Sequence, residues 1–169
     1  MNTLRIRDAG PDDQAAVVEV TLAAYEQYSV MVPAHWEAYR QNILATLATP
    51  GQGMQIVADE EERLVGAVLL YPTGSEFAVP GGGTVRLEEP EVRLLAVAPS
   101  ARGRGVGLEL MHECIRRARH SRAAALTLHT MDMMQAAMRM YERIGFERAA
   151  ALDFQPAPGV TIKGFRLGL

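Results

Sequence analysis

The stretch that decides the fold is Leu94-Leu95-Ala96-Val97, followed by Arg102-Gly103-Arg104-Gly105-Val106-Gly107. The apolar run predicts a strand, the glycine-rich run predicts a tight loop, and the amphipathic segment after it predicts a helix. Glycine lets the backbone adopt positive φ angles and approach a ligand closely, while the unpaired N–H groups and the dipole of a first helical turn attract an anion. Two arginines add positive charge. The stretch therefore predicts a loop that holds a pyrophosphate.

The spacing of the glycines separates this loop from two other nucleotide-binding loops. A dinucleotide fingerprint that starts at Gly103 needs a third glycine at position 108, where the chain has Leu108, and it belongs near the first strand of a domain. A triphosphate loop needs Gly-Lys followed by Ser or Thr, and the only lysine of the chain is Lys163. The pattern that remains is Arg-x-x-Gly-x-Gly over residues 102–107.

This hexapeptide resembles the acyl-coenzyme A pyrophosphate loop of the GCN5-related N-acetyltransferases, the GNAT superfamily. A second segment, residues 134–146 (MQAAMRMYERIGF), is similar to the last conserved helix of that family, with Tyr141 near its end. Local physics agrees, because apolar residues recur at helical spacing, Gly145 suits the left-handed position that ends a helix, and Phe146 can fold back as an apolar contact. The resemblance covers about residues 88–148.

Periodicity along the rest of the chain predicts the remaining elements. Strands are expected over residues 3–7, 54–58, 63–71, 125–130, 148–154 and 161–167, and helices after residues 10–13 and after Pro33. The acidic turn at 59–62 makes a hairpin of two of the strands. The segment from Pro72 to Pro90, which contains Gly81, is expected to be a flexible connection or flap. The fold class is α/β: one GNAT-like domain over residues 1–169, with a mixed, mostly antiparallel sheet and helices on both faces.

Length, composition and charge fit one soluble domain, for which a cytoplasmic location is expected. The 169 residues carry a net charge of −3 with dispersed arginines, so no basic face for nucleic acid is expected. The longest apolar run, residues 64–71, is too short for a membrane span, and the start of the chain lacks a signal-peptide core. Cys114 is the only cysteine, which excludes an intrachain disulfide. No metal is expected.

The resemblance implies acetyl transfer from acetyl-CoA to a primary amine by direct attack in a ternary complex. Such a reaction needs a base for the amine, donors for the oxyanion and an acid for the thiolate. Glu91, six residues before Val97, is similar in position to the base glutamate of several family members; it acts directly or through water. Alternatively, Glu91 forms only a structural ion pair with Arg93, on the same strand face.

Other cofactor contacts follow from the same resemblance. Backbone N–H groups around Leu95, Ala96 and Val97 would polarise the thioester carbonyl, with the side chains serving only to pack. The position of Tyr141 within Tyr-Glu-x-x-Gly-Phe favours the role of acid over that of an ordinary core tyrosine. Many family members have an asparagine seven residues earlier that contacts the cofactor; here that cofactor-binding position is Met134. The remaining cofactor-binding residues are those of the loop: Arg102, Gly103, Arg104, Gly105, Val106 and Gly107.

The acceptor is less defined by the sequence. By resemblance the first two helices and the terminal hairpin shape its cleft, and aromatic residues there either bind an amine, pack in the core or form a dimer interface. These are Tyr25, Tyr28, His35, Trp36 and Tyr39. Dispersed acids favour a small primary amine or a free amino terminus over a polybasic tail, with Glu88 and Glu89 placed to attract one ammonium. His129 is either structural or close to the cleft.

Two other functions remain open from the residues. A catalytically silent acyl-CoA-binding module would need the loop but neither Glu91 nor Tyr141. A nucleotide-binding protein of another class would need a loop with a different spacing. Binding of acetyl-CoA, CoA, NAD and ATP separates the second alternative from the others.

Overall fold

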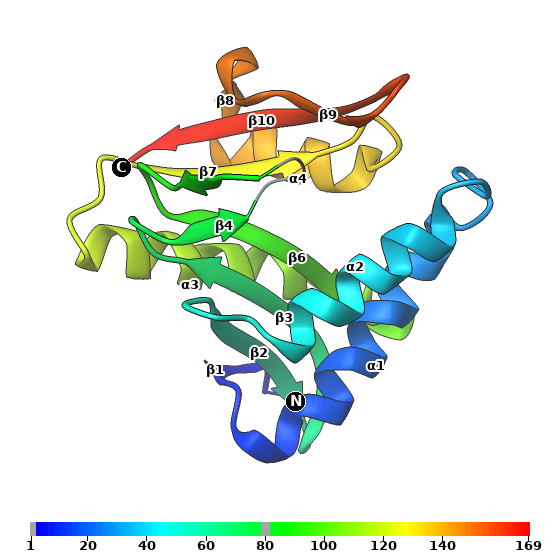
Figure 1. Cartoon of the computed structure of the whole chain (residues 1–169). Coiled ribbons are helices and arrows are strands. Elements are labelled where there is room, and N and C mark those ends of the chain that lie inside the picture. Colours follow the sequence, from blue (N-terminus) through cyan, green and yellow to red (C-terminus); the bar gives the residue numbers. More distant parts are fainter. Residues whose placement is uncertain (1–2, 79–81) are drawn as a thin grey trace. The chain divides into compact units, whose positions relative to one another are not determined.

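The chain folds into an α/β structure with a mixed, mostly antiparallel sheet, as the sequence predicts (Figure 1). A computed structural model describes residues 3–78 and 82–169. Their strands are β1 (Arg5–Asp8), β2 (Met54–Glu60), β3 (Arg63–Tyr71), β4 (Glu76–Ala78), β5 (Thr84–Arg86), β6 (Glu91–Val97), β7 (Ala125–Thr130), β8 (Glu147–Arg148), β9 (Phe154–Ala157) and β10 (Val160–Gly168). Their α-helices are α1 (Gln14–Tyr25), α2 (Trp36–Ala48), α3 (Val106–His120) and α4 (Gln135–Ile144). Short 3₁₀ helices are η1 (Pro11–Asp13), η2 (Glu26–Tyr28), η3 (Pro99–Ala101) and η4 (Ala150–Leu152).

These elements group into two compact units, and β6 and α3 contribute to both. The first unit runs to Leu70 and includes Leu94–Cys114, whereas the second contains Tyr71–Arg93 and Ile115–Leu169. Within residues 3–78 and 82–169, no helix has both the length and the apolar character that crossing a bilayer requires.

The first unit holds β1, β2, β3 and the end of β6 side by side in that order. The predicted hairpin is confirmed: β2 and β3 pair antiparallel, and Glu61 and Glu62 at its tip both have positive φ, as a tight two-residue turn requires. Ile56, Val57 and Ala58 are consecutive and fully buried. Because neighbouring strand residues point to opposite faces, β2 is covered on both sides. Helices α1 and α2 pack against each other in this unit (Figure 1).

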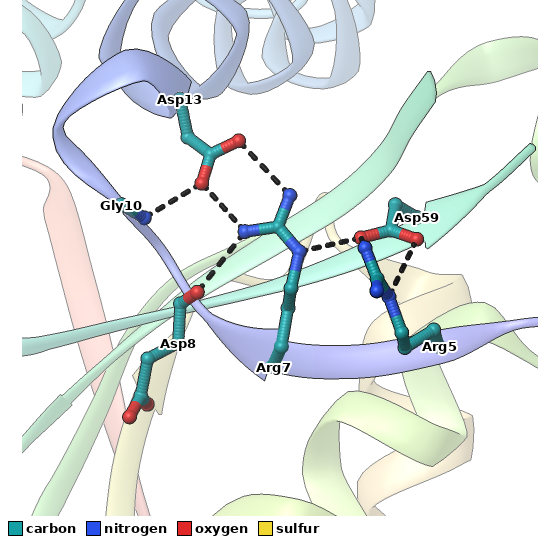
Figure 2. A network of polar contacts seen from close by, with 6 residues as sticks. All are labelled: Arg5, Arg7, Asp8, Gly10, Asp13 and Asp59. Atoms are coloured by element: carbon teal, nitrogen blue, oxygen red, sulfur yellow. Dashed lines mark hydrogen bonds and ion pairs between the residues drawn. The ribbon is translucent and has the colours of Figure 1, made fainter. Parts of the chain in front are cut away.

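The N-terminal strand is fastened by a polar network (Figure 2). Arg7 donates from Nε to Asp59 Oδ2 at 2.6 Å and from Nη1 to Asp13 Oδ2 at 2.6 Å. Asp13 also accepts from the amide of Gly10, and Arg5 reaches Asp59 as well. The Arg7 hydrogen bond and the Gly10 amide together lower the pKa of Asp13 to about 2. The network joins β1, η1 and β2.

The second unit contains the start of β6, then β7, β10 and β8. Glu91 and Val92 of β6 pair in parallel with Thr127 and Leu128, while β10 runs antiparallel to β7. Helix α4 ends as predicted: Gly145 is left-handed at φ 110°, and the amide of Phe146 returns to the carbonyl of Tyr141.

The structure adds detail to one sequence expectation and contradicts another. The segment 72–90 contains a two-stranded ribbon of β4 and β5, where Phe77 pairs with Val85; its Gly81 lies outside the described residues. The strand expected over 148–154 is divided into β8, η4 and β9. Part of the reason is Gly164 of β10, where an added Cβ would overlap Cβ of Leu152. A residue without a side chain at 164 lets η4 approach β10, so the chain bends here instead of remaining extended.

Candidate functional site

The glycine loop has the backbone that the sequence predicts. Gly103 and Gly105 have φ angles of 73° and 82°, in the left-handed region that disfavours residues with a Cβ. Helix α3 then begins at Val106, and the amide of Glu109 is the first to bond back to Gly105. The N–H groups of the preceding helical residues therefore lack an intrahelical acceptor, as at any helix start. This geometry suits an anion.

The two loop arginines are already engaged with the protein. Arg102 donates from Nη2 to the carbonyl of Ala24, near the end of α1, at 3.1 Å. Arg104 donates from Nη2 to both carboxylate oxygens of Glu60 at 2.8 and 2.6 Å, and the Glu60 side chain is 10% exposed. The sequence predicts added positive charge here, but Glu60 compensates that of Arg104. In this arrangement the arginines support the loop.

Gly66 of β3 sets how closely α3 approaches the sheet. An added Cβ there would lie 2.9 Å from Val106 Cγ1, 3.0 Å from Leu110 Cδ1 and 3.1 Å from the Ala96 carbonyl oxygen. The first distance is shorter than real Cβ contacts show, and the other two are tighter than nine in ten of them. The start of α3, and with it the end of the loop, therefore packs directly on the backbone of the strand.

The strand before the loop is irregular at Leu94. This residue has a φ of 50°, a conformation that costs a non-glycine residue roughly 1–2 kcal/mol. Beyond it, Ala96 is buried at 1% exposure and the amide of Ala98 bonds to the carbonyl of Val65. The irregularity interrupts the regular strand just before Leu95, Ala96 and Val97. The family resemblance implies that the backbone N–H groups of these three residues contact the thioester.

Glu91 lies in a polar cluster of the second unit. Its side chain is 5% exposed, with Arg93 bonded to Oε1 and His129 Nδ1 at 3.3 Å from Oε2. Burial alone would raise the pKa of Glu91, but the hydrogen bond from His129 and the positive charges of Arg93 and His129 outweigh burial and lower it. The ion pair between Glu91 and Arg93, one of the two predicted roles, is therefore present; it does not exclude the other.

Arg93 contacts both Glu91 and two aromatic rings, those of Phe77 and Tyr71. Its guanidinium carbon lies 3.8 Å from the centroid of the Phe77 ring and 5.3 Å from that of Tyr71, and these two rings pack edge to face. Such cation–π contacts stabilise the Arg93 guanidinium in its position over the two rings. The ribbon of β4 and β5, through Phe77, thus helps to fix the arginine that holds Glu91.

His129 is close to Glu91 and is held by two contacts of its own. Its Nε2 lies 2.9 Å from the carbonyl oxygen of Leu152, its ring packs edge to face on Phe154 at 5.3 Å, and its side chain is 21% exposed. Burial alone would lower the pKa of His129, but Glu91 and the Leu152 carbonyl outweigh it and raise the pKa. No spacing in the sequence marks this contact, because residues 91, 129 and 152 lie on three separate elements.

Tyr141 occupies the position that the resemblance predicts. It lies on α4, is 6% exposed and packs edge to face on Phe146 at 5.9 Å. Met134 stands at the N-terminal end of the same helix, where its sulfur accepts a hydrogen bond from Thr130 Oγ1 at 3.4 Å. Glu91, Met134 and Tyr141 thus belong to the second unit, whereas residues 95–97 and 102–107 belong to the first.

The sequence pattern of the acetyltransferase (GNAT) family matches residues 18–146. The chain belongs to the GNAT family. An uncharacterized N-acetyltransferase of Schizosaccharomyces pombe is 30% identical over 113 residues, which are 66% of this chain and 63% of that protein. The chain therefore spans less than two thirds of the length of this relative.

Solved structures share the fold. A GNAT-family structure from Desulfovibrio desulfuricans is 20% identical with a TM-score of 0.70, covering 98% of this chain and 99% of the other. A GNAT acetyltransferase from Brucella melitensis, crystallised with acetyl-CoA, is 22% identical with a TM-score of 0.61 and covers 96% of both chains. The predicted family and fold are confirmed.

In this GNAT chain the residues predicted near the acceptor form an aromatic chain in the first unit. Tyr25 packs edge to face on Tyr28 and on Tyr39, both at 5.9 Å, and Tyr39 packs on Trp36 at 6.1 Å, while His35 is exposed. Mutual packing accounts for these rings without a ligand. Binding of an amine by this cluster stays a prediction.

The acids expected to attract an ammonium are less available than the sequence indicates. Glu89 accepts from Arg166 at 2.6 and 3.0 Å, which compensates its charge, whereas Glu88 is exposed. Ion pairs of this kind between partly exposed groups contribute little to stability, but they do cancel a local field.

Proposed function

We propose that this GNAT chain is an N-acetyltransferase that moves an acetyl group from acetyl-CoA to a primary amine by direct attack in a ternary complex. The observation that carries the proposal is the loop at residues 102–107, whose two left-handed glycines lead into the first turn of α3. The acetyl-CoA complex of the Brucella melitensis relative supports the same cosubstrate. We take residues 1–169 to act as a single acetyltransferase domain.

The loop fits a pyrophosphate on its own geometry. An added Cβ at Gly103 or Gly105 would meet no atom within 4 Å, so the space beside both residues is open. The N–H groups at the start of α3 supply donors without a charged side chain. Residues 102–107 would hold the diphosphate, and the backbone of residues 95–97 would hold the acyl arm. When bound, acetyl-CoA supplies an acyl group activated as a thioester.

Tyr141 is the proposed acid. Attack by the neutral amine forms a carbon–nitrogen bond and breaks the carbon–sulfur bond. The nitrogen loses one proton as it becomes an amide, and the departing thiolate gains one. Phenols titrate near ~10 and thiols near ~8.5 in water, so a phenol in contact with a thiolate can donate to it. Tyr141 is buried on α4, and its contact with the Phe146 ring holds its own ring in place.

Glu91 is the proposed base. Alkyl ammonium groups titrate near ~10, so most of the acceptor is protonated at neutral pH and must lose a proton before attack. A carboxylate whose pKa is lowered remains ionised at that pH, because Arg93 and His129 stabilise its charged form. Glu91 accepts the proton directly or through water.

The acceptor is proposed to be a small primary amine or a free amino terminus. A polybasic tail would need a long run of uncompensated acids. Two acids of the turn at 59–62 are paired with arginines: Asp59 with Arg5 and Arg7, and Glu60 with Arg104. Their charges therefore support the fold and are not free to attract a basic peptide.

An amine panel tests the proposal. The protein is mixed with acetyl-CoA and, one at a time, small alkyl amines, aryl alkyl amines, peptides with free amino termini and a polybasic peptide, and release of free thiol is measured. Thiol release that depends on a small amine or an amino terminus supports the proposal. CoA binding without any release would instead identify an acyl-CoA-binding module, and turnover on the polybasic peptide alone would overturn the choice of acceptor.

A further inference from the structure

Both ring nitrogens of His129 face hydrogen-bond acceptors. Nε2 lies 2.9 Å from the carbonyl oxygen of Leu152, and Nδ1 lies 3.3 Å from Oε2 of Glu91. A backbone carbonyl can only accept, so Nε2 carries a hydrogen. If Nδ1 carried none, its lone pair would point at a carboxylate. The arrangement is therefore satisfied only when the pair contains one more proton, placed between Nδ1 and Oε2.

We infer that Glu91 and His129 share one proton and act as a unit in which His129 is a positioning residue that sets the basicity of Glu91. This inference rests on the proposed function, in which Glu91 is the base. In its basic form the unit is a carboxylate beside a neutral imidazole. One N–H bond of the ammonium breaks, the proton passes through Glu91, and one N–H bond forms at His129; no other bond changes.

The charged side chains near Glu91 and His129 already have partners of their own. On β6, Arg93 occupies the other oxygen, Oε1, so the proton has only Oε2 to share. On β10, Gly164 lies opposite His129 in the register, and the adjacent Lys163 is paired with Asp132. After η4, Asp153 is paired with Arg148.

The net effect of these charges has a definite direction. Glu91 favours protonation of His129, while Arg93 and burial oppose it, and the pKa of His129 is raised above its ordinary value. Lys163 and Asp153 are compensated by their own partners. Of the charges that face the ring, that of Glu91 therefore determines the direction in which the pKa of His129 is shifted.

Gly164 makes the second contact of the imidazole possible. Because residue 164 lacks a side chain, η4 lies close enough to β10 for the Leu152 carbonyl to reach Nε2. The amide of Gly164 also donates to Asp153 Oδ1 at 2.9 Å, which fixes the chain just after Leu152. The carbonyl is thus held in place by the fold.

The unit makes a specific prediction about pH. Below the raised pKa of His129 the unit already carries its proton and cannot take another, so it is inactive as a base. Above that pKa it is basic, and kcat/KM rises as the pH passes through a value higher than the ordinary ~6.5 of histidine. With an alkyl amine that titrates near ~10 as the acceptor, an isolated, ion-paired carboxylate would add no titration in this range.

The first test is an NMR titration of the histidine rings in the full chain, with His129→Gln used to assign the signals. We expect His129 to titrate above ~6.5 with both ring nitrogens protonated at pH 6, and its pKa to fall by about one unit or more in Glu91→Gln. Glu109→Gln is the matched control, because it removes the exposed partner of His112 and leaves His129 unchanged. A His129 pKa that is at or below ~6.5 and unaffected by Glu91→Gln would overturn the inference.

The second test is the pH profile of acetyl transfer. In His129→Gln we expect the rise near neutral pH to disappear and kcat/KM at pH 8 to fall about tenfold or more, with the affinity for acetyl-CoA unchanged. An unchanged profile would contradict the role of His129 in catalysis. Absence of transfer to every amine would contradict the proposed function instead, while the NMR titration still decides whether the proton is shared.

Discussion

The proposed pyrophosphate loop and the Glu91–His129 cluster are built in opposite ways. The loop is six consecutive residues, its donors are backbone N–H groups, and its shape depends on the positive φ angles of Gly103 and Gly105. The cluster joins side chains of β6 and β7 to a carbonyl of η4. A backbone site has no group that titrates near neutral pH, whereas the cluster contains the imidazole of His129. We therefore expect pH to control turnover while cofactor affinity stays constant.

The largest expected effect is on the loop. Gly105→Asp places an L residue at a φ of 82° and a negative charge beside the helix start, so the Kd for CoA should rise by about 100-fold or more, as measured by calorimetry. Gly51→Asp is the matched control, because Gly51 also has a positive φ and open space but lies in the turn before β2. Equal Kd values for CoA in a folded Gly105→Asp protein and in the wild type would remove the loop from the site.

The next largest effect is expected on kcat, without a change in the affinity for acetyl-CoA. Tyr141→Phe keeps the ring packed on Phe146 but removes the proposed proton donor, so kcat should fall by about 100-fold while the Kd for acetyl-CoA changes less than about twofold. Tyr71→Phe, which keeps the ring that faces Arg93, serves as the control and should leave kcat near the wild-type value. A parallel loss of binding and turnover in Tyr141→Phe would mean that the residue only shapes the cofactor site.

A smaller effect tests whether the side chains of the loop contribute to the affinity for CoA. Arg104→Gln and Glu60→Gln should each raise the Kd for CoA by about three- to tenfold, because either change releases the loop from β2. The double variant should be no weaker than the single ones, since the pair acts as one support. Tighter binding in Glu60→Gln would show instead that Arg104 leaves Glu60 to contact the phosphates.

The smallest expected effect concerns charge near the cluster. Changing both Glu88 and Glu89 to glutamine should raise the KM of the amine by no more than about threefold and leave the acetyl-CoA affinity alone, because Arg166 compensates Glu89. The effect should shrink with added salt, since exposed charges are screened. A large, salt-insensitive increase in KM would place these residues in direct contact with the acceptor.

The same difference explains what the sequence could predict. The loop, β7 and the end of α4 are encoded by neighbouring residues, so glycine spacing and hydrophobic periodicity are sufficient to locate them. The ribbon of β4 and β5 was missed because strands of three residues carry too little periodicity. The division of the expected strand at 148–154 depends on Gly164, which is distant in the sequence but adjacent in space.

Partners of the site residues were the least predictable feature. Glu91 and Arg93 are two residues apart, so their ion pair could be anticipated. The contacts of Arg104 with Glu60 and of His129 with Glu91 join residues from separate elements, and nothing in their local sequence marks them. Only the tertiary fold specifies these contacts, and they determine how the site residues are charged and supported.

Gly66 has a consequence for anyone who rebuilds this protein. The loop at 102–107 looks like a portable cassette, yet α3, which follows it, rests on a residue about forty positions earlier that has no side chain. If the hexapeptide were transplanted into a scaffold with a larger residue at the position of Gly66, that side chain would push the start of α3 away from β3. The smallest transferable module is therefore the loop together with Gly66 and Leu110. Directed evolution of cofactor preference should keep Gly66, Val106 and Leu110 fixed while residues 102–105 are varied.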